Sequence, residues 1–346
     1  MRLSGRPEYS GDVRQSIEHV VRLEQAGLDI IWVAEAWGYD AATLMGYLAA
    51  RTQRVQIGSG ILNIYSRTPA LLAQTAAGLD VLSEGRAILG LGASGPQVIE
   101  GWHGVPYDRP LRRTREIVEI CRRIWRREAL SYQGECYTLP LPAEQGSGLG
   151  KPLKLLVRPP RARIPIYLAA LGARNVELTA EIADGWMPLF YVPEWAALVW
   201  GESLARGRAH RSADLGPLEI VAGGPVAIGE GLEHLRDLAR PRLALYLGGM
   251  GARGHNFYND LICRYGFPDA AAEIQDLYLA GRRAEAAAAV PAELLEATTL
   301  IGSLGYVRDR LAAYHAAGVT ILNIEPVGPD PLATIAQLKE WAAALG

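Results

Sequence analysis

Apolar positions along the chain fall into two alternating patterns, one typical of helices and one typical of buried strands. Residues 10–26, with Ser10 as the expected N-cap, place their apolar side chains on one face, and Gly27 ends the segment. Residues 28–35, LDIIWVAE, are too apolar for a half-exposed strand and suit a parallel sheet covered on both faces. The same succession of helix end, glycine, buried strand and acid returns at residues 317–325.

Six further segments predict strands: a short one around Leu3, and residues 55–60, 87–91, 165–169, 185–190 and 218–228. Together with the two above they make eight βα units, which over 346 residues indicate a closed (β/α)8 TIM barrel of the α/β class. An open, doubly wound sheet needs fewer strands, and no GxGxxG motif opens a helix after the first strand. We therefore expect one barrel domain over residues 1–346.

Two stretches interrupt this rhythm. Residues 131–163, rich in proline and glycine, predict a long excursion between strands four and five with a small hairpin near residues 132–139. Residues 232–297 are almost wholly helical in pattern. Insertions of this length between barrel strands usually serve as lids, binding loops or oligomer contacts.

The composition is that of a soluble globular protein, with 49% hydrophobic and 21% charged residues. A net charge of -2 and a pI near 6.3 argue against nucleic acid or a membrane surface as partner. The arginines of residues 109–127 alternate with Glu116, Glu119 and Glu128, so we interpret this segment as a solvated barrel helix with ion pairs. Three scattered cysteines, no secretion signal and no apolar run of membrane-spanning length favour the cytoplasm.

In a barrel of this kind, binding and catalytic side chains follow the carboxyl ends of the strands. Here these positions carry glycines, amides, aromatic residues and acids but no His/Cys cluster, so we expect no metal site. Residues 93–101, ASGPQVIEG, and 171–175, LGARN, place small residues where a helix begins, which leaves backbone N–H groups open to an anion such as phosphate. A planar, phosphorylated cofactor that spans both stretches would explain them, and so would plain tight turns.

Four blocks of sequence, in this order, resemble the luciferase-like superfamily of flavin and deazaflavin oxidoreductases: GSGILNIYSRTP, LGLGASGPQVIEGW, YLAALGARNVELTAEIADGWMP and IGSLGYVRDRLAAYHAAGVT. Within this superfamily the chain is most similar to the F420-dependent branch, which includes methylenetetrahydromethanopterin reductase and actinobacterial relatives. The likeness extends over nearly the whole chain. It implies a bacterial luciferase-like barrel, commonly a homodimer, with its tricyclic cofactor at the C-terminal mouth.

The resemblance also implies which residues bind the cofactor. It places a non-prolyl cis peptide bond between Gly60 and Ile61, behind the deazaflavin ring, and Asn63 in the loop that follows, where cofactor contact and simple loop solvation both stay open. The residues that would edge the ring or the ribityl chain are Ser94, Gly95, Pro96 and Gln97. Those that would hold the phosphate are Leu171, Gly172 and Ala173, assisted by Arg174 or Asn175.

The chain departs from the family pattern in two places. Several relatives have an Asp-His pair after the second strand, where this chain has Glu35-Ala36. Some have a glutamate after the glycines of the fourth strand, where this chain has Pro96-Gln97. These departures argue against the sugar-phosphate and alcohol substrates of such relatives.

The function that the resemblance implies is hydride transfer between C5 of coenzyme F420 and a C=C, C=N or carbonyl group of a small-molecule substrate. Glu35 or Glu100 would supply or take a proton, and Trp37 would wall the substrate pocket. The alternatives are structural ion pairs for the two acids, as for Glu325, and a core position for Trp37. The rival functions are an FMN-dependent two-component monooxygenase of the same superfamily and a non-catalytic flavin-binding barrel.

Overall fold

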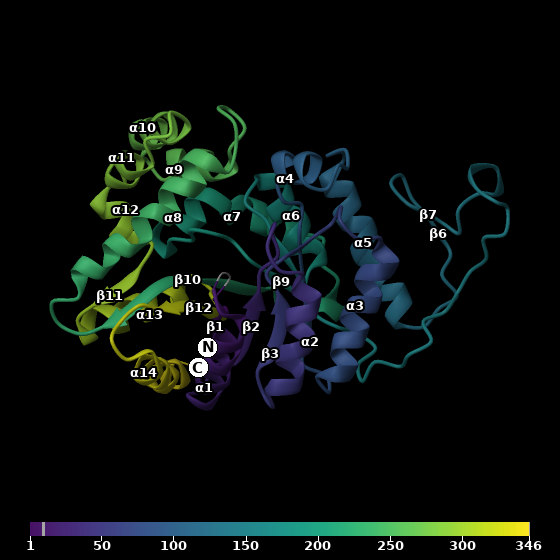
Figure 1. Ribbon diagram of the computed structural model, residues 1–346, viewed down its shortest axis with the longest axis horizontal. Coiled ribbons are helices and arrows are strands. Elements are labelled where there is room, and N and C mark those ends of the chain that lie inside the picture. The colour runs from purple at the N-terminus through teal and green to yellow at the C-terminus, as the bar shows by residue number, and fades with distance from the viewer. Residues whose placement is uncertain (9–10, 346) are drawn as a thin grey trace.

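The computed structural model describes residues 1–8 and 11–345, and within them eight parallel strands close into a ring. In ring order the strands are β1 (Arg2–Gly5), β2 (Ile30–Val33), β3 (Gln56–Ser59), β5 (Ala87–Gly92), β8 (Ile166–Ala169), β9 (Gly185–Trp186), β10 (Glu219–Ile228) and β12 (Ile321–Pro326). Pairing of β9 with β10 and of β12 with β1 completes the circle. Figure 1 shows the ring surrounded by helices, which confirms the predicted (β/α)8 barrel.

The predicted strand limits need three corrections. β9 ends at Trp186 instead of reaching Phe190, because Pro188 has no N–H to donate to a sheet ladder. After β3 the chain resumes pairing as β4 (Leu62–Asn63), beside β5. An unpredicted strand, β11 (Leu300–Gly302), pairs with the far end of β10 outside the ring.

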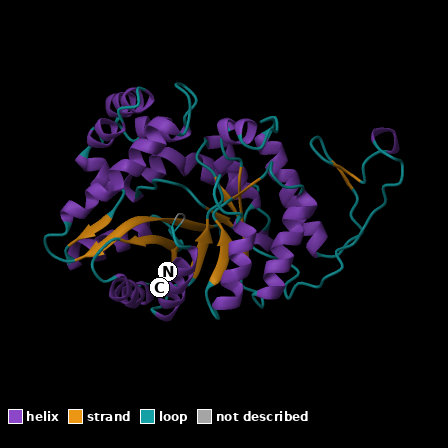
Figure 2. Cartoon of the chain, viewed as in Figure 1, coloured by secondary structure: helices purple, strands orange, loops and turns teal. Residues whose placement is uncertain are grey.

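Helices cover the outer face of the strands, as the purple helices around the orange strands in Figure 2 show. They are α1 (Val13–Gln25), α2 (Ala41–Arg51), α3 (Pro69–Leu82), α5 (Pro110–Trp125), α6 (Ala173–Ile182), α7 (Pro193–Ala209), α13 (Leu304–Ala316) and α14 (Pro331–Ala344), and the short α4 (Pro96–Gly101) lies at the mouth after β5. The carboxylate of Asp12 caps α1 by accepting the N–H groups of Arg14 and Gln15. Ser10, the predicted cap, lies outside the described residues.

The inside of the barrel is closed at its N-terminal end. A buried layer packs across the lumen: Ile30, Trp32, Ile88, Tyr167, Val221 and Ile321. Below it, Arg2 donates to Gln56 Oε1 at 2.7 Å and pairs with Glu219, and the hydroxyl of Tyr167 donates to the same carboxylate. Burial and the neighbouring Glu219 raise the pKa of Tyr167, so this hydroxyl keeps its proton. Among the described residues, this leaves the C-terminal mouth as the end of the barrel that is open to a ligand.

The excursion after α5 begins with the predicted hairpin, formed by β6 (Tyr132–Gln133) and β7 (Thr138–Leu139). Residues 140–163, with the short 3-10 helix η1 (Ala143–Gln145), continue as an arm that stands away from the barrel at the right of Figure 1. Glu116 of α5 is not solvated as we expected. It is 2% exposed, and its carboxylate accepts the N–H groups of residues 135, 136 and 137 at 2.9–3.0 Å. Burial there is tolerated because backbone donors replace water around the charge.

The stretch 232–297 folds into short helices between β10 and β11, at the top left of Figure 1. They are η3 (Glu233–Ala239), α8 (Arg240–Ala244), η4 (Leu245–Gly249), α9 (Phe257–Arg264), α10 (Pro268–Leu279), α11 (Arg283–Ala288) and α12 (Ala292–Ala297). Across the described part of the chain, the helices are all too short or too polar to cross a bilayer.

Candidate functional site at the barrel mouth

The carboxyl ends of the barrel strands form one rim, which has two sides. The loops after β3, β5 and β8, three neighbours in the ring, carry the glycine-rich segments expected to hold a cofactor. The ends of β1, β9, β10 and β12, also neighbours, line a pocket together with α8. The two sides therefore face the same opening.

The glycines at the end of β3 leave room for a large side chain inside the barrel. A Cβ atom at Gly58 would lie 2.3 Å from the ring of Trp32, and one at Gly60 would lie 3.0 Å from the Cβ of Trp32. The Gly60–Ile61 peptide bond is cis, at the position that the resemblance implied. The indole N–H of Trp32 is buried and has no hydrogen-bond partner within residues 1–8 and 11–345. The lumen below the rim thus holds one free donor.

Asn63 orders the loop that follows. Its Oδ1 accepts the N–H groups of Tyr65 at 3.0 Å and Ser66 at 2.7 Å. The amide nitrogen therefore faces His103, 3.2 Å from Nε2. Since Nδ2 can only donate, Nε2 accepts and the ring proton of a neutral His103 sits on Nδ1. Asn63 holds two loops of the rim together, a role that we did not assign to it or to His103 from the sequence.

Glu35 takes part in a structural ion pair, the alternative that the sequence left open. Both of its oxygens accept from Arg67, at 2.5 and 2.8 Å, and Oε2 also accepts the N–H of Ala41 at 3.0 Å. Both side chains are nearly buried, at 9% and 12% exposure. Arg67 also pairs with Asp40, the N-cap of α2, and the hydrogen bond to Glu35 raises the pKa of its guanidinium. The group holds the start of α2 against the loop after β4.

The other two predicted catalytic residues lie in the open. Trp37 is 58% exposed, so it occupies neither the core nor the wall of the pocket in this structure. Glu100 is exposed and accepts the N–H of Tyr107 at 3.1 Å, which closes the loop after α4. Neither side chain converges with Glu35 on one point.

The segment after β5 brings small residues to the rim. Ser94 has a left-handed backbone, with φ of 58°, and its carbonyl accepts from the hydroxyl of Tyr107 at 3.4 Å. Gly95 is the N-cap of α4 and supplies no side-chain hydrogen bond, and Pro96 begins the helix. Gln97 is exposed beside them. Because most of these four residues are small, few side chains stand over the mouth beside β5.

The start of α6 offers two open backbone donors. Gly172 is its N-cap, and the amides of Asn175 and Val176 bond to the Gly172 carbonyl at 3.0 and 2.9 Å. The N–H groups of Ala173 and Arg174 have no partner in the described chain, and a Cβ at Gly172 would meet nothing within 4 Å. Open amides and the positive end of a ten-residue helix suit a phosphate.

Two buried tryptophans hold the loop in front of α6. The indole of Trp186 donates to the carbonyl of Ala170, and that of Trp200 donates to the carbonyl of Leu171, both at 2.9 Å. The two rings meet edge to face with centroids 5.2 Å apart. With its carbonyls tied to the core, the loop is left with its amides for a ligand. The Arg174 side chain instead lines a groove between α5 and α6.

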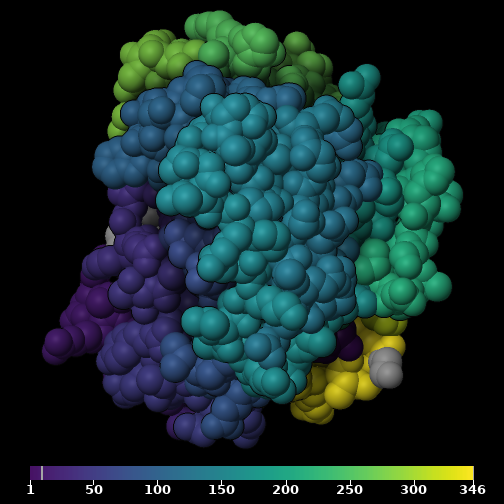
Figure 3. Space-filling model, turned by 90° about the vertical axis from the view of Figure 1, so that its right-hand side faces the viewer, coloured from purple at the N-terminus to yellow at the C-terminus, as the bar shows by residue number. Residues whose placement is uncertain are grey.

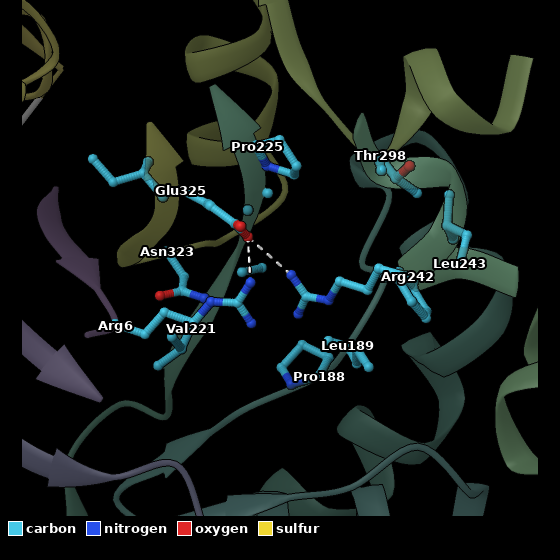
Figure 4. A pocket seen from close by; sticks show the side chains of 16 residues that line it. Arg6, Pro188, Leu189, Val221, Pro225, Arg242, Leu243, Thr298, Asn323 and Glu325 are labelled. Carbon is cyan, nitrogen blue, oxygen red and sulfur yellow. Dashed lines mark hydrogen bonds and ion pairs between the residues drawn. The ribbon is translucent and has the colours of Figure 1, made fainter. Parts of the chain in front are cut away.

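The pocket on the other side of the rim contains three charged side chains among its described lining residues: Arg6, Arg242 and Glu325 (Figure 4). Both guanidinium groups reach Oε2 of Glu325, with Arg242 Nη1 at 3.1 Å. Burial, reinforced by the nearby Arg6, lowers the pKa of Arg242. The sequence pattern points to Glu325 but to neither arginine.

No local pattern could have revealed these arginines, because Arg6 and Glu325 are 319 positions apart. The available signal was the expected strand order, which puts the first and last barrel strands side by side. In the described residues, no three His, Cys, Asp or Glu side chains are grouped so as to hold a metal ion.

Comparison with known proteins agrees with this architecture. The sequence is 42% identical, over 93% of both chains, to Rv3520c of Mycobacterium tuberculosis, which is assigned by name to the coenzyme F420-dependent oxidoreductases. It is 27% identical, over 93% of both chains, to 5,10-methylenetetrahydromethanopterin reductase of Archaeoglobus fulgidus. The coenzyme F420-dependent tetrahydromethanopterin reductase of Methanopyrus kandleri superposes with a TM-score of 0.82 at 20% identity, covering 99% of this chain and 98% of that one. Residues 1–320 match the luciferase-like monooxygenase family, and the chain belongs to that family.

Proposed function

We propose that this protein is an F420-dependent oxidoreductase that transfers a hydride between the deazaflavin and a C=C, C=N or carbonyl group of a small molecule. The observation that carries the proposal is the 42% identity to the F420-assigned relative over 93% of both chains. The family as a whole also contains flavin monooxygenases, so the identity of the cofactor depends on this relative. The chemistry of the rim supports the same reading.

The rim fits a phosphorylated, planar cofactor. The open amides of Ala173 and Arg174 would hold its phosphate, and the segment from Ser94 to Gln97 would leave space for the ring system beside Gly60 and Ile61. When bound, reduced F420 supplies a hydride from C5, which together with one proton reduces a double bond. The chain's own tasks are then to bind, orient and exclude water.

Glu35 and its hydrogen-bond partners contribute to this task by holding loops of the rim in place. The Glu35 carboxylate accepts three N–H groups, two from the Arg67 guanidinium and one from Ala41 at the start of α2, so both of its oxygens are engaged in structural contacts. We therefore assign Glu35 to holding the loops after β2 and β4 in place, and not to proton transfer. Glu100 has the same kind of structural task at the loop after α4.

Titration of the purified protein with F420 and, separately, with FMN tests the proposal. We expect the fluorescence of F420 to change when it binds. Its affinity should be about ten-fold or more higher than that of FMN. Reduced F420 should then be oxidised by at least one acceptor from a panel of enoates, imines and ketones. Tight FMN binding with no F420 binding would favour the monooxygenase, and F420 binding with no turnover across the panel would favour the non-catalytic barrel.

A further inference from the structure

The pocket on the β1, β9, β10 and β12 side has no role in the proposed cofactor binding. The cofactor contacts lie on the β3, β5 and β8 side of the rim. Its charged end is formed by Arg6, Arg242 and Glu325, which converge from the loop after β1, from α8 and from β12 (Figure 4). Because it opens on the same rim, a molecule in it would lie next to a cofactor placed over the other side. The pocket is thus in the right place for the second reactant.

The charges in this pocket do not balance. Two guanidinium groups share one carboxylate, so the charged end carries a net charge of +1. Among the described residues, Arg6 donates one side-chain hydrogen bond, to Glu325, and Arg242 bonds Glu325 and Tyr246, so each guanidinium keeps several of its five N–H donors for a ligand. The guanidinium carbon of Arg242 also lies 5.9 Å from the centroid of the Tyr246 ring, which helps to hold the group in place. Unused donors in a partly desolvated, net positive pocket favour an oxyanion.

Apart from Asn323 and Thr298, the other side chains that line the pocket are apolar. Pro188 and Leu189 face the arginines from the loop after β9, and Leu243 of α8 closes another wall. On the β10 side, two glycines between Val221 and Pro225 expose backbone, and a Cβ at Gly224 would lie 2.3 Å from the carbonyl oxygen of Thr298. The pocket therefore combines a short apolar slot with one charged end.

From this juxtaposition we propose that the pocket binds the carboxylate of a substrate whose short apolar body carries the group to be reduced. The inference rests on the proposed function, and it names the class of substrate: an unsaturated or oxo carboxylic acid. A single carboxylate matches the net charge of +1 and the planar donor edge of a guanidinium, whereas a phosphate dianion would be left with an unbalanced negative charge. Cationic substrates are excluded by the same charge.

The test is equilibrium binding of trans-cinnamate, with its methyl ester as the uncharged match, to the F420-loaded protein. F420 binding is measured first in every variant, so that failure of the proposed function is seen separately. We expect the acid to bind at least about ten-fold more tightly than the ester, and Arg242→Gln to abolish that preference while F420 affinity stays unchanged. Arg253→Gln, which removes an exposed arginine paired with Asp276, should leave the preference intact.

Glu325→Gln provides a change of opposite sign. It raises the net charge of the pocket from +1 to +2 and releases N–H donors of both arginines, so the acid should bind several-fold more tightly. This variant keeps the test decisive if Arg242→Gln does not fold. If F420 binds but acid and ester bind equally, or if Glu325→Gln weakens the acid, the carboxylate assignment is wrong and the proposed function still stands. If F420 does not bind, the proposed function itself fails.

Discussion

At the scale of single residues, a mutation of Glu35 can show whether this side chain positions the loops or transfers a proton. Replacing it with Gln removes the charge that Arg67 faces in a nearly buried pair. We expect Glu35→Gln to lower the free energy of unfolding by about 1–3 kcal/mol, because hydrogen bonds to a charged group are the strong ones. Urea unfolding measures this change. In contrast, kcat with reduced F420 and an active acceptor should fall only a few-fold.

The matched control is Glu18→Gln, in which a 55% exposed glutamate loses its pair with Arg51. Exposed pairs contribute little, so its unfolding free energy should change by no more than about 0.5 kcal/mol. Unchanged stability together with a loss of turnover in Glu35→Gln would restore Glu35 as the proton donor.

A second residue-scale prediction concerns pH. Arg115 bonds both oxygens of Glu181, linking α5 to α6, and these bonds lower the pKa of Glu181 below its usual 4.5. A depressed carboxyl pKa stabilises the fold above the unfolded-state pKa and loses that effect as pH falls through the folded-state pKa. The stability difference between wild type and Glu181→Gln should therefore be constant from about pH 8 to 5 and shrink progressively as the pH falls further, through the lowered pKa of Glu181. A difference that grows on acidification, in unfolding curves collected across this range, would contradict this.

Sequence analysis reached some of these residues and missed others for physical reasons. The start of α6 at Gly172 was located from its local run of small residues, whereas the cis bond between Gly60 and Ile61 followed only from the resemblance to the luciferase-like superfamily. Glu116 was misread as solvated because its backbone partners follow it by about twenty positions. Partnerships across the barrel leave no local periodicity, so neither Arg6 nor Arg242 was found.

At the scale of elements, a substitution at the N-terminus of α6 should raise the stability of the fold and lower the affinity for F420. Gly172→Asp places a carboxylate beside the open amides of Ala173 and Arg174, at an N-cap whose φ of -68° and ψ of 143° accept any residue. We expect the variant to be about 0.5–1 kcal/mol more stable, since it caps the helix and meets its dipole. F420 affinity should fall about ten-fold or more, because the carboxylate occupies the place of the phosphate and repels it.

Thermal unfolding and F420 titration give the two measurements. Gly172→Ala is the control, because its added methyl group would meet nothing within 4 Å and brings no charge. That variant should bind F420 within about two-fold of wild type. Undiminished binding by Gly172→Asp would show that the phosphate lies elsewhere on the rim.

Elements with strong local signals were predicted well, and those defined by pairing were not. β2 could be predicted from its run of buried apolar residues, and β12 from a similar run that follows a glycine. β11 is only three residues long and exists because it pairs with the extended end of β10. β9 is shorter than its apolar run, because pairing partners and a proline set its length.

At the scale of the whole molecule, the arm of residues 140–163 departs most from a closed barrel. The return of the arm is anchored by Arg161, whose guanidinium pairs with the fully buried Asp80 of α3. Its outer part carries large apolar side chains in water: Leu141, Leu149, Leu153, Leu156 and Val157. Figure 3 shows this arm, in teal, on the side that faces the viewer. Exposed apolar groups gathered on one segment are typical of an interaction surface.

We propose that this arm packs against a second copy of the chain, giving the homodimer expected from the sequence. Sedimentation should then report twice the 37.5 kDa mass of one chain. Leu156→Glu puts a charge on a side chain that is 93% exposed, so it should leave the monomer folded and shift the protein to the single-chain mass, because a buried unpaired charge is costly at an interface. The control is Leu304→Glu, at the start of α13 on the far side of the barrel in Figure 1, which should stay dimeric. A dimer that survives Leu156→Glu would assign the contact to another face, and a wild-type chain that sediments as a monomer would leave the arm to some other partner.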